Sequence, residues 1–365
     1  MTITVVVGTR PEVIKMAPVI QALEKLRADF NYVLTGQHHD YNMLRQFVEE
    51  LRLPAPFASF QLSSSRPASE IGEIMAKLEP ILVDTHILLI QGDTNSMLAS
   101  ALTAIKAGLP VAHVEAGLRS YDWRMPEEHN RRMVDHVSDA LFAPTERARQ
   151  NLVEEHAYGR VLVTGNTVVD AVLEYMPYAL KSSSIMDSIQ FQQFCLVTFH
   201  RAENVDSPQT LADLVDALLQ IEYPIVFPVH PRTNARLHEF GLYSKLSTSR
   251  LIHLLPPVGY FDTLVLLKNC EFVMTDSGGL QEEVTVPTIR KPVIVLRHTT
   301  ERPEAVENRF AYLVGVDKNK IVYRVKQLIS KGPDLPDHSP FGDGQSSDRI
   351  GQFILDEFQS TDSKK

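Results

Sequence analysis

The chain has 365 residues, a hydrophobic content of 44% and a formal net charge of −9. This length fits two domains better than one. The negative charge argues against a broad nucleic-acid surface. No apolar stretch approaches the ~20 residues that cross a bilayer, and the first residues do not resemble a signal peptide. We therefore expect a cytoplasmic protein with reduced cysteines, no nucleic-acid partner and no membrane partner.

Strand-like and helix-like patterns alternate along the first half of the chain. Apolar, β-branched runs predict strands at Val5–Gly8, Tyr32–Thr35, Ile87–Gln91, Val111–Val114, Ala140–Ala143 and Val161–Thr164. Helical spacing predicts helices at Val13–Leu26, Tyr41–Leu51, Ala68–Leu82, Ser96–Lys106 and Thr167–Tyr175, with another opening at Pro126.

The same alternation restarts after a serine-rich segment, Lys181–Asp187, which is the best linker candidate. Strands are predicted at Cys195–Thr198, Ile225–Val229, Leu251–Leu255, Phe272–Thr275 and Val293–Leu296. Helices are predicted at Leu211–Leu219, Phe261–Leu267, Gly279–Val284, Lys320–Ser330 and Arg349–Phe358. Two such runs predict an α/β protein with two Rossmann-like, doubly wound domains facing a cleft. We assign residues 1–180 and 190–345 to these domains, and 346–365 to a helix that packs back on the first.

Several of the predicted strands end in turns that carry glycine and charge. Gly8–Glu12, Gly92–Thr94 and His113–Arg119 occupy such turns in the first half. Open α/β folds bind ligands at the carboxyl ends of their strands, and helix N-termini suit phosphate. Arg10 would hold a phosphate, and Lys15 would face the same anion one helical turn later. A plain strand–helix turn with surface charges is the alternative.

The second half has a matching turn at Thr275–Gly279. Ser277 and the amides of Gly278 and Gly279 form a ready anion cradle. Glu283 lies one helical turn further on, where it would accept hydrogen bonds from ribose hydroxyls. The alternative is an N-capped helix with solvated acids.

Three carboxylates in the first half are candidates for acid–base chemistry. Asp93, Glu115 and Glu127 each follow a strand or open a helix. A cap or an ion pair is the alternative for each, and Glu127 could pair with Arg131 four residues later.

Two histidines, His200 and His230, end strands in the second half. His230 could move a proton or bind phosphate, and His200 offers a second positive group for a diphosphate or a sugar. A structural role is the alternative for a single histidine at a strand end.

No cofactor or metal is expected from the motifs. The first turn lacks the Gly-x-Gly-x-x-Gly fingerprint of dinucleotide binding and the Gly-Lys-Ser/Thr of a phosphate-binding loop. Cys-x-x-Cys, His-x-x-x-His and Asp-x-Asp are also missing.

Taken together, the motifs resemble a known family. They are Gly-Thr-Arg-Pro-Glu with Lys15, Gly-Asp-Thr, His-Val-Glu-Ala-Gly-Leu-Arg, Pro-Glu-Glu-x-Asn-Arg, Gly-Asn-Thr-Val-Val-Asp, His-Arg-Ala-Glu-Asn, Pro-Val-His-Pro-Arg, Asp-Ser-Gly-Gly-Leu-Gln-Glu-Glu and Thr-Glu-Arg-Pro-Glu. From about Thr4 to Ile354 the chain resembles the non-hydrolysing UDP-N-acetylglucosamine 2-epimerases, which have the two-domain B-type glycosyltransferase fold.

The resemblance implies interconversion of UDP-GlcNAc and UDP-ManNAc by elimination and re-addition of UDP, supplying ManNAc-type sugars for surface polysaccharides. It also implies a homodimer. Family catalytic positions fall on Asp93, Glu115, Glu127 and His230. Nucleotide-binding positions fall on Arg10, Ser277, Gly278, Gly279 and Glu283. The family's site or its cleft is lined by the positions of Lys15, Arg131 and the Arg302–Glu304 segment.

The chain departs from the family pattern at three places. His298 follows Arg297 where many relatives have Asp, and the segment after Glu283 is about two residues longer than usual. Gln37 and His38 match the start of the family's allosteric region, but the residues after them do not. Four other functions stay open: a hydrolysing epimerase, a glycosyltransferase, an epimerase of a modified UDP-sugar, and a UDP-sugar sensor without catalysis.

Overall fold

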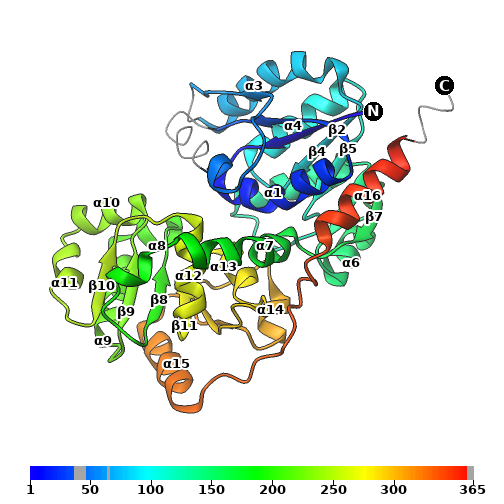
Figure 1. Cartoon of the computed structure of the whole chain (residues 1–365). Coiled ribbons are helices and arrows are strands. Elements are labelled where there is room, and N and C mark those ends of the chain that lie inside the picture. Colours follow the sequence, from blue (N-terminus) through cyan, green and yellow to red (C-terminus); the bar gives the residue numbers. More distant parts are fainter. Residues whose placement is uncertain (37–46, 64–65, 360–365) are drawn as a thin grey trace. The chain divides into compact units, whose positions relative to one another are not determined.

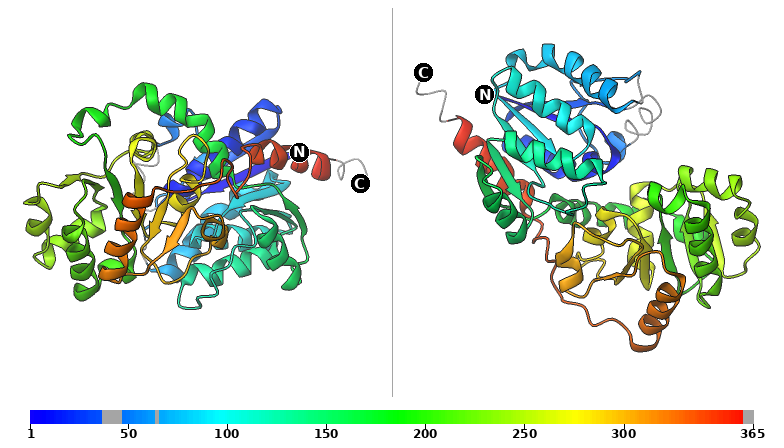
Figure 2. Two further views of the ribbon diagram at one scale, coloured as in Figure 1. Left: turned by 90° about the horizontal axis from the view of Figure 1, so that it is seen from below. Right: turned by 180° about the vertical axis from the view of Figure 1, so that it is seen from behind.

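The computed structural model describes residues 1–36, 47–63 and 66–359 (Figures 1 and 2). The chain divides into two compact units: unit 1 comprises Met1–Ala171 with Phe341–Lys365, and unit 2 comprises Val172–Pro340. The first division falls inside a helix, α7 (Thr167–Ser182), before the serine-rich segment. The end of α7 and a 3-10 turn, η2 (Ile185–Ser188), occupy most of that segment.

Unit 1 is built on a parallel sheet of seven strands in the order β3-β2-β1-β4-β5-β6-β7. The strands are β1 (Thr2–Val7), β2 (Asp29–Leu34), β3 (Ala58–Ser59), β4 (Ile87–Gln91), β5 (Val111–Val114), β6 (Ala140–Ala143) and β7 (Arg160–Val163). The helices are α1 (Arg10–Lys25), α3 (Pro67–Leu78), η1 (Glu79–Asp84), α4 (Asn95–Lys106), α5 (Pro126–Val137), α6 (Glu146–Glu154) and α16 (Ser346–Gln359). The central strands are buried along their length except at Thr2, the first residue of β1, as expected for a parallel sheet covered on both faces.

The C-terminal helix α16 packs on α1, as the sequence predicts. The contact is close at Gly351, where an added Cβ would lie 3.0 Å from Leu26. Phe353 meets Phe142 of β6 edge to face, with ring centroids 5.4 Å apart. Unit 1 therefore contains both ends of the described chain.

Unit 2 is built on a parallel sheet of six strands in the order β10-β9-β8-β11-β12-β13. The strands are β8 (Cys195–Thr198), β9 (Ile225–Pro228), β10 (Ile252–Leu255), β11 (Phe272–Thr275), β12 (Val293–Val295) and β13 (Ala311–Leu313). The helices are α8 (Ala202–Val205), α9 (Pro208–Gln220), α10 (Pro231–Glu239), α11 (Tyr243–Ser247), α12 (Tyr260–Asn269), α13 (Gly278–Glu283), α14 (Pro303–Glu307) and α15 (Lys318–Lys331).

The core of unit 2 contains both cysteines of the chain, Cys195 and Cys270, which are buried and free of disulfides. Burial raises the pKa of Cys270 to about 12 and places that of Cys195 well above its usual value. Both thiols are therefore protonated at neutral pH and are weak nucleophiles.

The predicted fold class is confirmed, and five strands (β4, β5, β6, β8 and β11) have the bounds that the sequence predicts. The sequence analysis missed β3 and β13, because strands of two or three residues carry no readable period. Most of the helix predicted at Tyr41–Leu51 lies outside the described residues. The part that the structure describes is helical at residues 47–50. None of the helices in the described ranges is both long and apolar enough to span a membrane.

Candidate active site

The turn after β1 is shaped by a glycine and a buried acid. A Cβ on Gly8 would lie 2.7 Å from the hydroxyl oxygens of Ser96 and Thr35, so no larger residue fits there. The Glu12 carboxylate accepts hydrogen bonds from the backbone N–H groups of Gly8 (2.6 Å) and Thr9 (2.7 Å). This reciprocal cap at the start of α1 fixes the turn that carries Arg10.

Glu12 also joins this turn to the one after β4. Its other oxygen accepts a hydrogen bond from the Thr94 hydroxyl at 2.6 Å. Burial raises the pKa of Glu12 to about 7, although these hydrogen bonds act in the opposite direction. The sequence analysis missed this bridging residue, because an acid in a first helical turn resembles an ordinary cap. Arg10 itself lies with its guanidinium over the ring of Phe47, 4.4 Å from the centroid.

Asp93 and Arg131 form an ion pair after β4. The guanidinium of Arg131 donates to the Asp93 carboxylate at 2.6 Å and to the Glu128 carboxylate at 3.0 Å. The side chain of Arg131 is 4% exposed and that of Asp93 is 29% exposed. Arg131 therefore holds a partly accessible carboxylate at the strand end, and its charge is directed to Asp93 and Glu128.

Glu127 and its neighbour Glu128 have opposite environments. Glu127 is exposed, whereas the Glu128 side chain is fully buried. Burial alone would raise the pKa of Glu128, but hydrogen bonds from Ser120 and the charge of Arg131 outweigh it and lower the pKa. Glu128 is thus an ionised structural carboxylate, and no local pattern in the sequence distinguishes it from Glu127.

Glu115 follows β5, the strand next to β4 in the sheet. Its φ of +69° lies in the left-handed region, where non-glycine residues are uncommon and often functional. Oε2 of Glu115 forms an ion pair with Nζ of Lys15 and accepts a hydrogen bond from Nδ2 of Asn166 at 3.1 Å. The structure therefore brings Lys15 and Glu115 together, and it adds Asn166, which the sequence analysis did not single out as a site residue.

Arg119 belongs to an internal network. Its side chain is fully buried between Asp135 (2.7 Å) and Glu155 (2.6 Å). Asp135 also meets Nδ1 of His113 at 2.8 Å and accepts from the N–H of Gly117. The charge of Arg119 is therefore directed to these two carboxylates, and it fixes the loop after Glu115.

In unit 2, one buried carboxylate organises two strand ends. Asp276 is fully buried and accepts hydrogen bonds from the backbone N–H groups of His200 (3.0 Å) and Arg201 (2.9 Å) and from Nδ2 of Asn204 (2.9 Å). The turns after β8 and β11 are thereby locked together. The sequence analysis missed this role, because partners more than seventy residues away cannot be read from a motif.

The two predicted histidines lie side by side in unit 2. The rings of His200 and His230 stack with centroids 4.9 Å apart and an interplanar angle of 29°. Nδ1 of His230 accepts a hydrogen bond from the backbone N–H of Arg232 at 3.2 Å. In the neutral ring the proton is then on Nε2, which makes this nitrogen the donor.

The two glycines of the β11–α13 turn differ. A Cβ on Gly278 would lie 2.9 Å from Oε1 of Glu301 and 3.3 Å from Arg302, whereas one on Gly279 would have no neighbour within 4 Å. Gly278 is thus required by packing, and Gly279 faces open space. Ser277, the N-cap of α13, donates its backbone N–H to Thr275.

Arg302 and Glu283 are both largely buried beside this turn. The Arg302 guanidinium contacts Glu282 at 2.8 Å and Glu301 at 2.7 Å, and Glu301 also pairs with Arg297 at 2.9 Å. The predicted ligand group Arg302 is therefore part of an ionic cluster that supports the glycine turn.

The two departures in unit 2 have clear structural positions. The ring of His298 packs on Gly315, where an added Cβ would lie 2.8 Å from it. In the longer segment, Thr285 and Ser339 share a hydrogen bond of 2.6 Å and Arg290 donates to the backbone at residues 335–336. The extra length thus packs against the chain before residue 340. Gln37 and His38, the proposed start of an allosteric region, lie outside the described residues.

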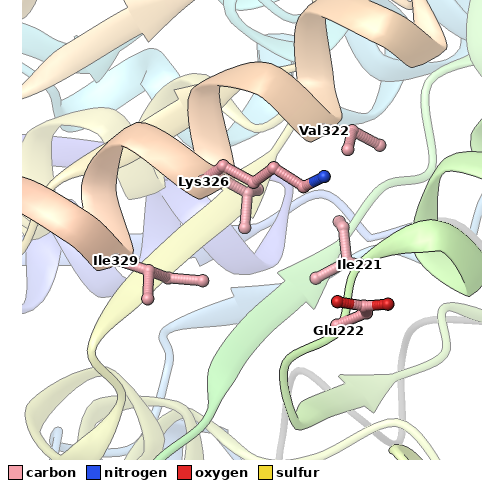
Figure 3. A pocket seen from close by; sticks show the side chains of 6 residues that line it. Ile221, Glu222, Val322, Lys326 and Ile329 are labelled. Carbon is pink, nitrogen blue, oxygen red and sulfur yellow. The ribbon is translucent and has the colours of Figure 1, made fainter.

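A groove of about 200 Å³ in unit 2 lies between α15 and the segment that follows α9 (Figure 3). Its lining residues are Ile221, Glu222, Val322, Val325, Lys326 and Ile329. Ile221 lies just before β9, so the groove is at the amino ends of the strands, opposite to the turns described above. Among residues 1–36, 47–63 and 66–359, no group of three or more His, Cys, Asp or Glu side chains could hold a metal ion.

Two Rossmann-like domains with charged turns at their strand ends match the B-type glycosyltransferase fold, in which ligands bind at the carboxyl ends of the strands. Residues 21–355 match the family model described as UDP-N-acetylglucosamine 2-epimerase. The chain belongs to the UDP-N-acetylglucosamine 2-epimerase family.

Individual relatives agree with this assignment. The UDP-N-acetylglucosamine 2-epimerase of Methanocaldococcus jannaschii is 42% identical over 365 residues, covering 97% of this chain and 99% of that protein. Its crystal structure with UDP-GlcNAc and UDP superposes with a TM-score of 0.90, at 41% identity and 97% and 99% coverage of the two chains. The UDP-2,3-diacetamido-2,3-dideoxy-D-glucuronate 2-epimerase of Pseudomonas aeruginosa is 36% identical, with 97% and 99% coverage.

Proposed function

We propose that the protein interconverts UDP-GlcNAc and UDP-ManNAc without hydrolysing them. The C2 hydrogen of such a sugar is not beside a carbonyl, so simple deprotonation is very hard. Elimination avoids the difficulty: a base takes the C2 proton, a C1=C2 double bond forms, and the C1–O electron pair leaves with UDP. UDP then adds back to C1 of the 2-acetamidoglucal while C2 receives a proton on the opposite face.

The arrangement of Asp93 and Glu115 carries this proposal. They follow neighbouring strands, β4 and β5, and each carboxylate is paired with a cation, Arg131 or Lys15. Two carboxylates at adjacent strand ends suit a reaction that removes a proton from one face and returns one to the other. We assign proton transfer to them, with Glu127 as the next candidate and His230 steering the diphosphate or the sugar.

Binding of UDP is assigned mainly to the β11–α13 turn of unit 2. Ser277 and the amides of Gly278 and Gly279 suit the diphosphate, and Glu283 suits the ribose. A well-placed donor on developing negative charge is worth about 3–4 kcal/mol, which favours departure of UDP. We add Arg10, Lys15, Arg131, His200 and Arg302 as groups that bind substrate or support those that do.

The wider role follows the family. We propose a cytoplasmic homodimer that supplies ManNAc-type sugars for surface polysaccharides. The free, buried cysteines suit a reducing compartment. No bound cofactor or metal is required, because elimination needs only acid–base groups and a leaving group.

One relative suggests a second candidate substrate. The 36% identical protein from Pseudomonas aeruginosa bears the name of a 2-epimerase for UDP-2,3-diacetamido-2,3-dideoxy-D-glucuronate. The higher identity of 42% to the Methanocaldococcus jannaschii enzyme favours UDP-GlcNAc. Both sugars should therefore be assayed in parallel.

The test is incubation of the purified protein with UDP-GlcNAc in deuterated water. We expect UDP-ManNAc with deuterium at C2 and no accumulation of UDP. Free ManNAc with stoichiometric UDP would indicate a hydrolysing enzyme. Absence of any product or exchange, with UDP still bound, would indicate a binding protein.

A further inference from the structure

The proposed reaction leaves one motif without a role: Gly165–Asp170, which follows β7. In this motif Asn166 is only 2% exposed, although it lies at the same edge of the sheet as Glu115. The C-terminal segment returns to unit 1 beside it, beginning at Phe341. A buried amide that joins a proposed proton-transfer group to a returning chain end calls for a functional explanation.

The side chain of Asn166 performs two separate tasks. Its Oδ1 accepts a hydrogen bond from the N–H of Val168 at 3.0 Å, at the start of α7. Its Nδ2 donates to Oε2 of Glu115 at 3.1 Å. The first contact shapes the backbone locally, and the second reaches a carboxylate 51 residues away.

The backbone of Asn166 is held by the returning segment. Its N–H donates to the carbonyl oxygen of Phe341 at 2.7 Å. The preceding Gly165 has a φ of +89°, and a Cβ there would lie 2.6 Å from Oγ of Ser346 and 3.3 Å from Gly342. Only glycine permits this close approach of the two chain segments.

A second contact lies one helical turn further along α7. Oδ1 of Asp170 accepts hydrogen bonds from the backbone N–H of Ser347 (2.8 Å) and from its hydroxyl (2.6 Å). The acid thus caps the first turn of α16 from outside that helix. Both ends of the Gly165–Asp170 motif are therefore attached to the same returning segment.

We propose that Asn166 is a positioning residue for Glu115 and that the returning segment, Phe341–Ser347, fixes it in place. Lys15 neutralises Glu115 but sits on a flexible stem, whereas a planar amide fixes direction as well. The left-handed backbone of Glu115 is a second sign that the position of this carboxylate is functional. The inference rests on the proposed function only where it assigns proton transfer to Glu115.

The variant Asn166→Ser separates the two tasks. A serine hydroxyl still accepts from Val168, and the backbone N–H still reaches Phe341, but the amide to Glu115 is lost. A hydrogen bond to a charged group is worth enough for kcat to fall by about tenfold or more. We expect KM and the Kd of UDP to stay within about threefold, and Tm to fall by only about a few degrees, because the folded joint is kept and only the hydrogen bond to Glu115 is lost.

Asn151→Ser is the matched control. Asn151 also donates its amide to the loop after β5, to the carbonyl oxygen of Gly117 at 2.9 Å, but it has no part in the proposed reaction. Its kcat should stay near the wild-type value. A kcat of Asn166→Ser within twofold of an active wild type would overturn the inference. So would a loss of kcat that comes with a large loss of both UDP affinity and Tm, which indicates a purely structural joint.

A second measurement does not depend on activity. The Tm values of Asn166→Ser, Glu115→Ala and the double variant form a cycle. If the two side chains interact, the Tm loss of the double variant is smaller than the sum of the two single losses. Additive losses would overturn the contact. Non-additive losses in a protein whose wild type shows no C2 exchange would keep the contact and remove the proposed function.

Discussion

The strand ends of the two units carry different functional groups. In unit 1, Asp93 and Glu115 carry carboxylates on adjacent strands, each beside a cation from a helix. In unit 2, the carboxylate of Asp276 is fully buried and holds the backbone of two turns in place. Both units shape their turns with a buried acid, Glu12 or Asp276, but unit 1 adds two carboxylates at its strand ends, whereas unit 2 adds the imidazoles of His200 and His230. Proton transfer and anion binding place these different demands on a strand end.

The largest expected effect is that of Glu115→Gln in unit 1. We expect turnover to fall by about 10³-fold, because a general acid or base contributes on this scale. The Kd of UDP should stay within a few fold, since unit 2 supplies most of the proposed diphosphate contacts. Steady-state kinetics and calorimetric titration with UDP measure both. Near-normal turnover would remove Glu115 from proton transfer.

The neighbouring acids of α5 offer a comparison within unit 1. Glu128→Gln should lower the free energy of unfolding by about 3 kcal/mol, because it leaves the buried Arg131 without one of its charge partners. Glu127→Gln should change it by less than about 0.5 kcal/mol, because Glu127 is exposed, but should slow turnover. Chemical denaturation measures the free energy of unfolding of both variants, and steady-state kinetics measure their kcat. Equal losses of stability would show that the environments do not differ.

The buried acid Glu12 predicts a pH dependence. Burial raises its pKa from 4.5 to about 7, so the folded state disfavours the ionised form. The contribution of Glu12 to stability is complete below about pH 4.5 and falls as the pH rises towards 7, by about 3 kcal/mol in total. Glu12→Gln has no such carboxyl and should gain stability relative to the wild type between pH 5 and 8. Parallel Tm profiles of the two proteins would contradict this assignment.

The smallest effects are expected at the glycine pair of unit 2. Gly278→Ala places a Cβ 2.9 Å from Glu301 and should cost about 1–3 kcal/mol of stability. Gly279→Ala meets nothing within 4 Å and should leave Tm unchanged or slightly higher. If UDP occupies the space in front of Gly279, that variant should nonetheless bind UDP less tightly. Full affinity in a stable Gly279→Ala would move the anion site elsewhere.

The sequence alone predicts the long elements and the strand-end turns, because buried β-branched runs and glycine turns are local signals. It does not predict α6 or α10, which are polar helices whose burial depends on neighbours distant in the chain. The same limit applies to the site. Asp93 and Glu115 stand out in motifs, whereas the roles of Glu12, Asn166 and Asp276 depend on partners brought close only by folding.

Cleavage and re-formation of the bond between C1 and UDP is the central claim, and positional isotope exchange tests it most directly. UDP-GlcNAc is prepared with ¹⁸O in the bridge between C1 and the β-phosphorus and is incubated with the enzyme. We predict that during epimerisation the label spreads from the bridge to the non-bridging oxygens of the β-phosphate, because departed UDP can rotate before it returns. Epimerised product that keeps all of its ¹⁸O in the bridge would contradict the elimination mechanism.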